Sequence, residues 1–241
     1  MARASNSISP RRSRSLRVEA DAMTSHHQRP PEVVADHLIV ASASLAHGID
    51  WIEDKLGARP RIGGKHPAMG THNALLRLGP RLFLEVLAVD PEAPTPLRSR
   101  WFDLDEPRMR ATLAEGPALI HWVARTTDIA AAVARCPEDL GAIVPAQRGN
   151  LHWRITVPAD GHLPGRGLVP TLIEWSDERH PTDSLPDVGL ELVALAGEHP
   201  EPAGVRAALA ALGLSETLKV TYERTPRLAA MLRTPRGVLT L

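Results

Sequence analysis

The hydrophobic positions of the chain fall into a pattern that occurs more than once. An apolar, strand-like run, DHLIVA at 36–41, is followed by apolar residues at helical spacing and then by Gly57. Residues spaced in this way share one face of a helix, and glycine is a common helix stop. The segment therefore predicts a strand followed by an amphipathic helix. The apolar helical positions are Leu45, Ile49, Ile52 and Leu56.

The same pattern returns 84 residues later. Its apolar positions are Ile129, Val133, Cys136 and Leu140, followed by Gly141. His37, inside the first apolar strand, has its counterpart in His121 at the same offset. One offset shared by five structural positions and a histidine indicates an internal repeat.

The strands that follow also match, with small changes in length. The stretch HNALLRLG parallels HWRITVPA, so His72 corresponds to His152. The stretch RLFLEVLAVDP parallels VPTLIEWSDER, so Glu85 corresponds to Glu174 at an offset of 89. The additional residues lie in GHLPGRGLVP, whose glycines and prolines are typical of a loop. Each unit therefore predicts a strand, a helix and two or three further strands.

A third, partial copy closes the chain. LELVALAGEHP is strand-like, and Gly213 ends a helical face at an offset of 156 from the first unit. The apolar residues of that face are Val205, Ala208, Leu209 and Leu212. Val193 stands where His37 stands in the first unit, so this copy lacks the polar residue. Terminal repeats that cap their neighbours commonly differ in this way.

The pattern predicts an α+β protein built from repeated βαβββ modules. We expect a disordered leader at 1–32, a first module at 36–90, a linker with a short helix at 91–117, a second module at 118–182 and a third partial module at 187–241. The leader carries six arginines and three prolines with little apolar periodicity. Such a segment cannot bury enough apolar surface to offset its ordering entropy.

Composition narrows the classes of function. The chain has 28 basic and 28 acidic residues, so it offers no net positive charge to nucleic acid or an anionic membrane. No stretch approaches the roughly 18 apolar residues of a transmembrane helix, and no apolar segment follows the basic start as in a secretory signal. The single cysteine, Cys136, fits a reducing compartment. We expect a cytoplasmic protein with a small-molecule partner, and neither nucleic acid nor membrane as a partner.

Four polar residues fall inside strands that should be largely buried: His37, Glu85, His121 and Glu174. Strand alternation places Glu85 on one face with apolar neighbours, where a carboxylate is costly unless it is paired, hydrogen-bonded or metal-bound. Alternation also sends Trp122, Trp153 and Trp175, each of which follows a His or Glu, to the opposite face, against the helices.

If a pseudo-twofold axis relates the two modules, the four polar side chains converge. Two imidazoles and two carboxylates suit one divalent ion such as Zn, Ni, Co, Mn or Fe. The alternative is that they pair with one another or with buried water. His72 and His152, which repeat, and His66, in a Gly-rich stretch, are candidate substrate-binding residues.

Repeated βαβββ units with His on the first strand and Glu on the last resemble the vicinal oxygen chelate (VOC) superfamily, and within it the glyoxalase-like domain group. The stretches that carry the resemblance are DHLIVA, the helix ending in KLG, GGKHPAMGTHNALLRLG and FLEVLAVDP. The resemblance implies a cup-shaped mixed sheet, with metal ligands at His37, Glu85, His121 and Glu174. Superfamily members of the extradiol dioxygenase and fosfomycin-resistance types use a set of three, here His37, His121 and Glu174. The glutathione-binding residues of glyoxalase I do not map onto this chain.

The resemblance implies a metal-dependent lyase, isomerase or dioxygenase acting on a small oxygenated substrate held in the cup. The metal would act as a Lewis acid, and Glu85 or Glu174 would be the catalytic general base. The alternative is a metal-free protein that binds or sequesters a drug or metabolite in the same cup. Superfamily modules pair within one chain or across a homodimer, and two good repeats favour pairing within the chain.

Overall fold

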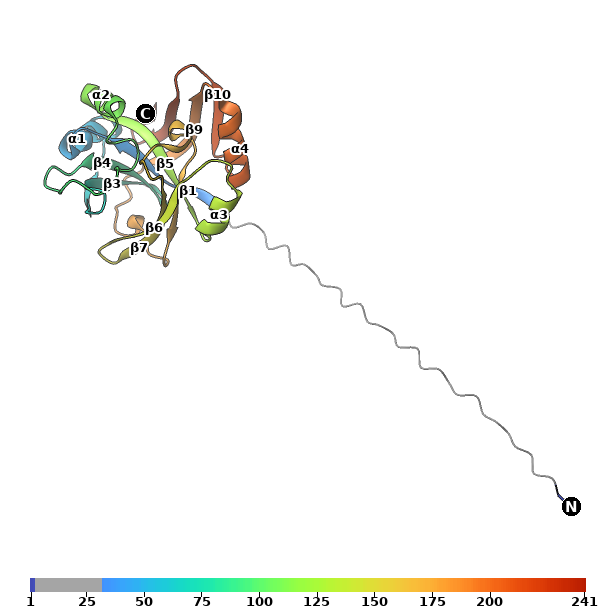
Figure 1. Cartoon of the computed structure of the whole chain (residues 1–241). Coiled ribbons are helices and arrows are strands. Elements are labelled where there is room, and N and C mark those ends of the chain that lie inside the picture. Colours follow the sequence, from blue (N-terminus) through green and yellow to red (C-terminus); the bar gives the residue numbers. More distant parts are fainter. Residues whose placement is uncertain (3–31) are drawn as a thin grey trace.

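The computed structural model describes residues 1–2 and 32–241. Nearly all of the predicted leader, 3–31, lies outside the described residues. The remainder forms two β-sheets with helices packed against them (Figure 1). Among the described residues, no helix is long and apolar enough to cross a membrane.

Two successive segments have the strand–helix–three-strand order that the repeat predicts. The first contains β1 (Val33–Ala41), α1 (Leu45–Leu56), β2 (Arg61–His66), β3 (Thr71–Gly79) and β4 (Leu82–Val89). The second contains β5 (Ala118–Thr126), α3 (Ile129–Arg135), β6 (Ala142–Arg148), β7 (Leu151–Val157) and β8 (Thr171–Trp175). Between them the linker carries α2 (Pro107–Glu115), and two short 3-10 turns, η1 (Pro164–Gly167) and η2 (Pro181–Asp183), flank β8.

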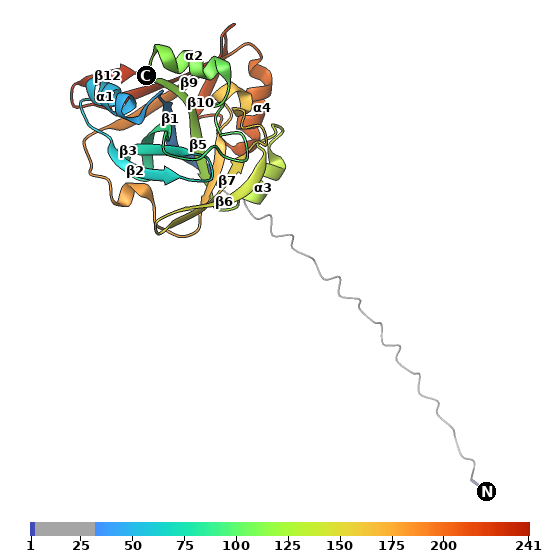
Figure 2. The same ribbon diagram turned by 60° about the vertical axis from the view of Figure 1, so that its left-hand side comes forward.

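Both segments contribute to one eight-stranded, strongly curled sheet with the order β2-β3-β4-β1-β5-β8-β7-β6. The first strand of each segment pairs in parallel with its last strand, β1 with β4 and β5 with β8. The two first strands meet antiparallel at the centre, which places a pseudo-twofold axis between β1 and β5 (Figures 1 and 2). The predicted α+β fold with a cup-shaped mixed sheet is confirmed.

Helix α1 forms where the apolar spacing predicts it. The side chain of Ser44 caps its start by accepting a hydrogen bond from the backbone N–H of His47. Gly57 ends it with φ of 74°, a left-handed conformation that glycine adopts without a Cβ penalty. The four predicted apolar residues are all buried, so this face packs on the convex side of the sheet.

Helix α3 is shorter than its repeat predicts. It ends at Arg135, and Cys136 already has an extended backbone. Pro137 follows, and the residue before a proline is disfavoured in the helical region. Leu140 nevertheless remains buried in the same core, so the chain keeps the apolar contact while losing the last helical turn.

The third copy repeats the strand and helix and then departs from the module. It contains β9 (Glu191–His199), α4 (Pro202–Leu212), β10 (Leu218–Tyr222), β11 (Arg227–Thr234) and β12 (Gly237–Thr240). These strands form a separate sheet with the order β10-β9-β11-β12, in which β10 pairs in parallel with β9. In the full modules, the strand that follows the helix instead pairs antiparallel with the strand after it, β2 with β3 and β6 with β7.

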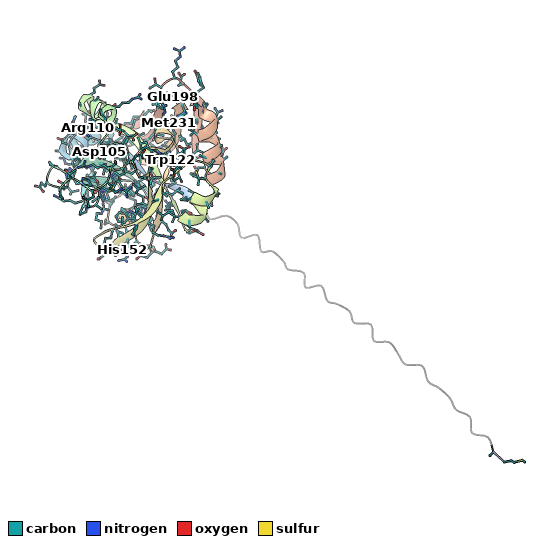
Figure 3. The ribbon with its side chains drawn as sticks, in the orientation of Figure 1. Asp105, Arg110, Trp122, His152, Glu198 and Met231 are labelled. Carbon is teal, nitrogen blue, oxygen red and sulfur yellow. The ribbon has the colours of Figure 1, made fainter. Side chains whose placement is uncertain are left out.

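The main hydrophobic core fills the space between the convex face of the large sheet, the helices and the second sheet. Trp122 of β5 lies at its centre with no exposed surface, and its indole N–H donates to the carbonyl of Leu168 over 3.0 Å. Figure 3 shows Trp122 well inside the ribbon. The prediction that Trp122 faces this core is thus confirmed.

We expect Trp122→Ala to lower the free energy of unfolding by about 3–5 kcal/mol, because it leaves a large cavity and an unpaired carbonyl. The measurement is equilibrium unfolding in urea at neutral pH. Met231, on the second sheet, is 41% exposed, so Met231→Ala is the matched control and should cost about 1 kcal/mol or less. Equal losses in the two variants would contradict this account of the core.

Candidate functional site

The register of the three central strands decides which side chains face the concave side. On β1, His37 lies opposite Phe83 of β4 and Val123 of β5. Two residues on, Ile39 lies opposite Glu85 and His121. Because side chains alternate along a strand and paired residues point to the same side, His37, Glu85 and His121 all belong to the concave face.

A β-bulge in β1 brings a second acidic residue to His37. The register with β5 shifts between Ala35 and His37, so that Asp36 has no direct partner on the neighbouring strand. Its carboxylate turns to its own neighbour, with Oδ1 lying 2.7 Å from Nδ1 of His37. Asp36 is completely buried, so the sheet holds this pair rigidly and away from water.

Three side chains lie within hydrogen-bond distance of the buried carboxylate of Asp36, and Nη1 of Arg125 lies 3.9 Å from its Oδ2. Besides His37, Nε2 of His180 lies 3.2 Å from Oδ2, and the indole N–H of Trp175 donates to Oδ2 over 3.0 Å. Burial raises the pKa of Asp36, but the hydrogen bonds and charges of His180 and His37 outweigh it and hold the pKa well below its usual range. Asp36 is therefore a permanent anion that fixes the orientation of the His37 ring.

The other nitrogen of His37 faces a second carboxylate. Nε2 lies 3.5 Å from Oε2 of Glu85, and the ring stacks on Phe83 with centroids 4.5 Å apart. Oε1 of Glu85 accepts a hydrogen bond from the amide of Asn73 over 2.5 Å. His37 and Glu85 thus form a close, buried pair at the polar end of the cup.

Asn73 connects this pair to the opposite edge of the sheet. Its Oδ1 accepts from the backbone N–H of Gly64 and from Nη1 of Arg148, which reaches across from β6. A Cβ on Gly64 would come within 2.6 Å of the Arg148 side chain, so the glycine leaves room for the arginine. Burial lowers the pKa of Arg148 and the charge of Glu85 raises it, and the guanidinium stays protonated.

His66, at the end of β2, is a neutral member of the site. Its Nδ1 lies 3.1 Å from Oγ1 of Thr71 and its Nε2 lies 3.4 Å from the amide nitrogen of Asn73. Burial lowers the pKa of His66 to about 4. Near neutral pH this imidazole therefore carries no charge.

These groups border two adjoining cavities inside the cup. The inner one, about 40 Å³, is lined by His37, His66, Asn73, Leu75, Phe83, Glu85, Trp101, Phe102, Arg148, Trp153, Ile155, Trp175 and Pro181. The outer one, about 410 Å³, is largely apolar and has His66, Trp101, Trp153 and Ile155 in common with the first. A ligand can therefore place a polar end at His37 and an apolar body outside it.

A segment of the linker, residues 98–106, covers the cup, and we call it the strap. Trp101 and Phe102 of the strap stack with centroids 5.3 Å apart. Trp101 lies edge-on to His66, and Phe102 lies over His121 at 5.2 Å. Both aromatic residues are buried, so the strap closes the site off from solvent on that side.

His121 lies on the concave face but its ring is fully engaged by the protein. Nδ1 lies 3.1 Å from the carbonyl of Gly167, and Nε2 accepts the backbone N–H of Thr171 over 3.1 Å. The side chain has no exposed surface, and burial lowers its pKa to about 3. With both nitrogens in hydrogen bonds, His121 offers no lone pair to a metal or a substrate.

Glu174 lies on the other face of the sheet. Its Oε2 accepts the backbone N–H of Ile129 at the start of α3 over 2.7 Å, and Oε1 pairs with Arg154 over 2.6 Å. A carboxylate at a helix N-terminus stabilises the helix through the aligned peptide dipoles. The structure thus gives Glu174 a structural role, remote from the cup.

The strand register shows why Glu174 and Glu85 differ. His37 lies opposite Phe83, two residues before Glu85. In the second module Val123 lies opposite Thr171 on the parallel strand. The position opposite His121 is therefore two residues before Thr171, just as Phe83 is two residues before Glu85. Thr171 thus occupies the place that Glu85 has in the first module. The true offset on this strand is 86 rather than the 89 that the sequence suggested, and an odd difference of three places a side chain on the opposite face.

Of the three candidate substrate-binding histidines, only His66 lies in the cup. His72 and His152 each precede a cup-facing residue, Asn73 and Trp153, and alternation turns them to the outer face. Figure 3 shows His152 at the rim of the fold, where it is exposed. Trp153 and Trp175 line the cup, whereas the alternation argument placed them against the helices.

The residues predicted to bind a metal therefore do not form one ligand set. His37 and Glu85 are adjacent, His121 has no free nitrogen, and Glu174 is on the far face. Within residues 1–2 and 32–241, no group of three or more His, Cys, Asp or Glu side chains is placed to hold a metal ion.

Four polar residues of the site escaped the sequence analysis: Asp36, Asn73, Arg148 and His180. Asp36 directly precedes His37 in an otherwise apolar strand, which was a usable signal, but the bulge that turns it inward leaves no mark in the sequence. His180 begins a capping box with Asp183, a local motif that says nothing about its distant contact with Asp36.

Comparisons with known proteins support this architecture. Residues 35–213 match the family described as glyoxalase-like domain. A search of curated proteins finds no significant match. Among solved structures the chain is similar to a hypothetical protein from Staphylococcus aureus, with a TM-score of 0.59 and 12% identity over 81% of this chain and 88% of that one. It also matches methylmalonyl-CoA epimerase from Mycobacterium tuberculosis, with a TM-score of 0.40 and 19% identity over 62% and 92% of the two chains. The likeness to the protein from Staphylococcus aureus shows the fold alone.

We expect stability to fall between pH 7 and pH 5, because His121 and His66 are buried in neutral form. Unfolding returns both pKa values to about 6.5, so the unfolded state binds more protons throughout this range. The stabilisation that the two neutral rings give is fully present above pH 6.5. It decreases as the pH falls towards the folded-state pKa of each ring, about 4 for His66 and about 3 for His121. At pH 5 each histidine accounts for a loss of about 2 kcal/mol relative to pH 7.

The measurement is urea unfolding at pH 7 and pH 5 for the wild type and His121→Gln. The variant should lose about 2 kcal/mol less than the wild type on acidification. His152→Gln, at an exposed position, is the control and should behave as the wild type. An unchanged pH dependence in His121→Gln would contradict the assignment of a buried neutral ring.

Proposed function

The chain belongs to the glyoxalase-like domain family, and we propose that it is an enzyme that transfers a proton on a small oxygenated molecule held in the cup. The observation that carries the proposal is the buried series Asp36–His37–Glu85, which ends at the inner cavity. The reaction class that this arrangement supports is isomerase or lyase chemistry beginning with proton removal next to a carbonyl.

Asp36 determines which nitrogen of His37 can react. Because Asp36 is ionised and accepts a hydrogen bond at Nδ1, the ring proton resides there and Nε2 faces the cavity. Without a proton, Nε2 of His37 and Oε2 of Glu85 would both be hydrogen-bond acceptors. Their 3.5 Å contact is therefore favourable when the two atoms share one proton. A pair that holds one proton can accept one from the substrate at one group and return one from the other.

The surrounding residues supply what such a step needs. Arg148, on the cavity wall, provides a positive charge that stabilises oxygen as it becomes negative during proton removal. The strap residues Trp101 and Phe102 exclude water, which strengthens that electrostatic interaction. The outer, mostly apolar cavity accommodates the remainder of the substrate. We assign His37 and Glu85 as the catalytic residues.

The assay is exchange of substrate hydrogen with deuterated water, followed by NMR across a panel of 2-oxo acids, 2-hydroxy acids and 1,2-diketones. We expect enzyme-dependent exchange for at least one class, and a decrease of about 10²–10⁴-fold in His37→Ala and in Glu85→Gln. Asp36→Asn should lower the rate as well, because the amide does not hold the His37 tautomer as the carboxylate does.

His152→Ala is the control, since this exposed histidine lies on the outer face and should keep full exchange activity. Circular dichroism of each variant separates lost chemistry from lost folding. Exchange that survives in both His37→Ala and Glu85→Gln would show that these residues do not carry the reaction. The absence of exchange across the panel would count against proton-transfer chemistry and favour the binding role considered below.

Metal dependence can be tested separately. His37 and Glu85 are the two predicted ligands that lie together, and a tightly held divalent ion needs three or more protein ligands. We expect protein prepared without chelator or His tag to contain well under one equivalent of Zn, Ni, Co, Mn or Fe by mass spectrometry. About one equivalent in the wild type, lost in Glu85→Gln, would instead support the metal-dependent function that the sequence implied.

A second candidate function is binding or sequestration of a small apolar molecule. The outer cavity favours it, because its lining is mostly apolar and its volume of about 410 Å³ lies in the range of ligand sites. A ligand that binds equally well to the wild type and to Glu85→Gln, without exchange or conversion, would support this role over catalysis.

A further inference from the structure

A third cavity lies outside the cup, between the start of α1, the end of β4, α2 and the strap. Its volume is about 370 Å³, and it is lined by Ser42, Ala43, Val89, Arg100, Leu104, Asp105, Arg110 and Leu113. The strap borders both sites, because Arg100 and Leu104 line this cavity while Trp101 and Phe102 line the inner cavity of the cup. The proposed catalytic function leaves this cavity without a role.

Two residues of its lining, Ser42 and Arg100, each carry a buried polar atom that has no hydrogen-bond partner in the described part of the chain. Oγ of Ser42 has no hydrogen bond within the described part of the chain, although the residue is only 2% exposed. Nε of Arg100 is likewise buried and unpaired among the described residues. An unsatisfied buried donor costs stability unless a bound group pairs with it, so each such atom in a native structure requires an explanation.

The charges of the lining leave a positive excess. Nη1 of Arg100 donates to Oδ1 of Asp105 over 2.7 Å, and the backbone N–H of Arg100 donates to Oδ2. Burial raises the pKa of Asp105, but these two hydrogen bonds, together with the charges of Arg100 and Arg110, outweigh it and lower the pKa. The ionised carboxylate therefore offsets one of the two guanidinium charges.

Arg110 provides the excess charge. Its guanidinium donates to the backbone carbonyl of Asp105, and among the described residues no carboxylate lies within ion-pair distance of it. Figure 3 shows Arg110 and Asp105 near one another beside α2. The guanidinium keeps further N–H donors, which suit a carboxylate or phosphate group.

The rest of the lining is apolar, from Ala43, Val89, Leu104 and Leu113. We propose that this cavity binds a small molecule that has one anionic group, a carboxylate or a phosphate, and a short apolar body. Arg110, Nε of Arg100 and Oγ of Ser42 donate hydrogen bonds to the anionic group, and the apolar side chains contact the body. The site is distinct from the cup and does not depend on the proposed reaction.

Isothermal titration calorimetry with butyrate and with inorganic phosphate tests this site. We expect saturable binding of at least one probe and a Kd that rises at least tenfold in Arg110→Gln. Ser42→Ala should raise the Kd about threefold or more without lowering stability, because the hydroxyl that it removes is unpaired in the free protein. Tighter binding of phosphate identifies a phosphate ligand, and tighter binding of butyrate identifies a carboxylate with an apolar body.

Two further variants make the result decisive. Arg108→Gln removes an exposed charge from the same helix at a position outside the cavity lining of the described structure, and its Kd should stay within twofold of the wild type. Arg148→Gln, in the cup, should also retain binding. The proposal is overturned if neither probe binds saturably, if Arg108→Gln weakens binding as much as Arg110→Gln, or if only Arg148→Gln abolishes it.

Discussion

The candidate site depends on one constraint, the complete burial of the Asp36 carboxylate. A charge without solvent must be surrounded by donors, and here these are the imidazoles of His37 and His180 and the indole of Trp175. The donors come from β1, from the segment before η2 and from β8, so satisfying one carboxylate joins both modules at the base of the cup. The bulge that turns Asp36 inward also orients His37 towards Glu85.

The two repeats match closely on the convex face of the large sheet and differ on its concave face. On the convex face the repeated apolar positions pack into one core, and both copies conserve their pattern because any change of volume there is costly. On the concave face the copies have diverged. His37 with Glu85 faces a cavity, whereas the equivalent pair, His121 with Thr171, is closed by hydrogen bonds to the backbone. One half of the pseudo-symmetric cup therefore holds the polar groups, and the other half supports them.

The strap contributes side chains to two separate cavities. A linker between repeats has no counterpart in either module, and here it supplies Trp101 and Phe102 to the cup and Arg100 and Leu104 to a separate cavity. Its backbone departs from the usual conformation at this point, since Phe102 and Asp103 have φ of 61° and 57°. The packing of the strap over the aromatic-lined cup holds that backbone in place.

The sequence by itself determined the α+β class, the repeated modules, the core face of α1 and the pairing of His37 with Glu85 in one region. These features are periodic, and periodicity survives in sequence because packing on one face needs it at every turn. Only the tertiary structure decided that Glu174 caps a helix and that the His121 ring is held by backbone hydrogen bonds. It also brought Asp36 and His180 into the site and placed Arg148 against Asn73 from the opposite edge of the sheet. The physical reason is the period of two in a strand: an insertion in GHLPGRGLVP or a one-residue bulge reverses a side chain without changing any local pattern.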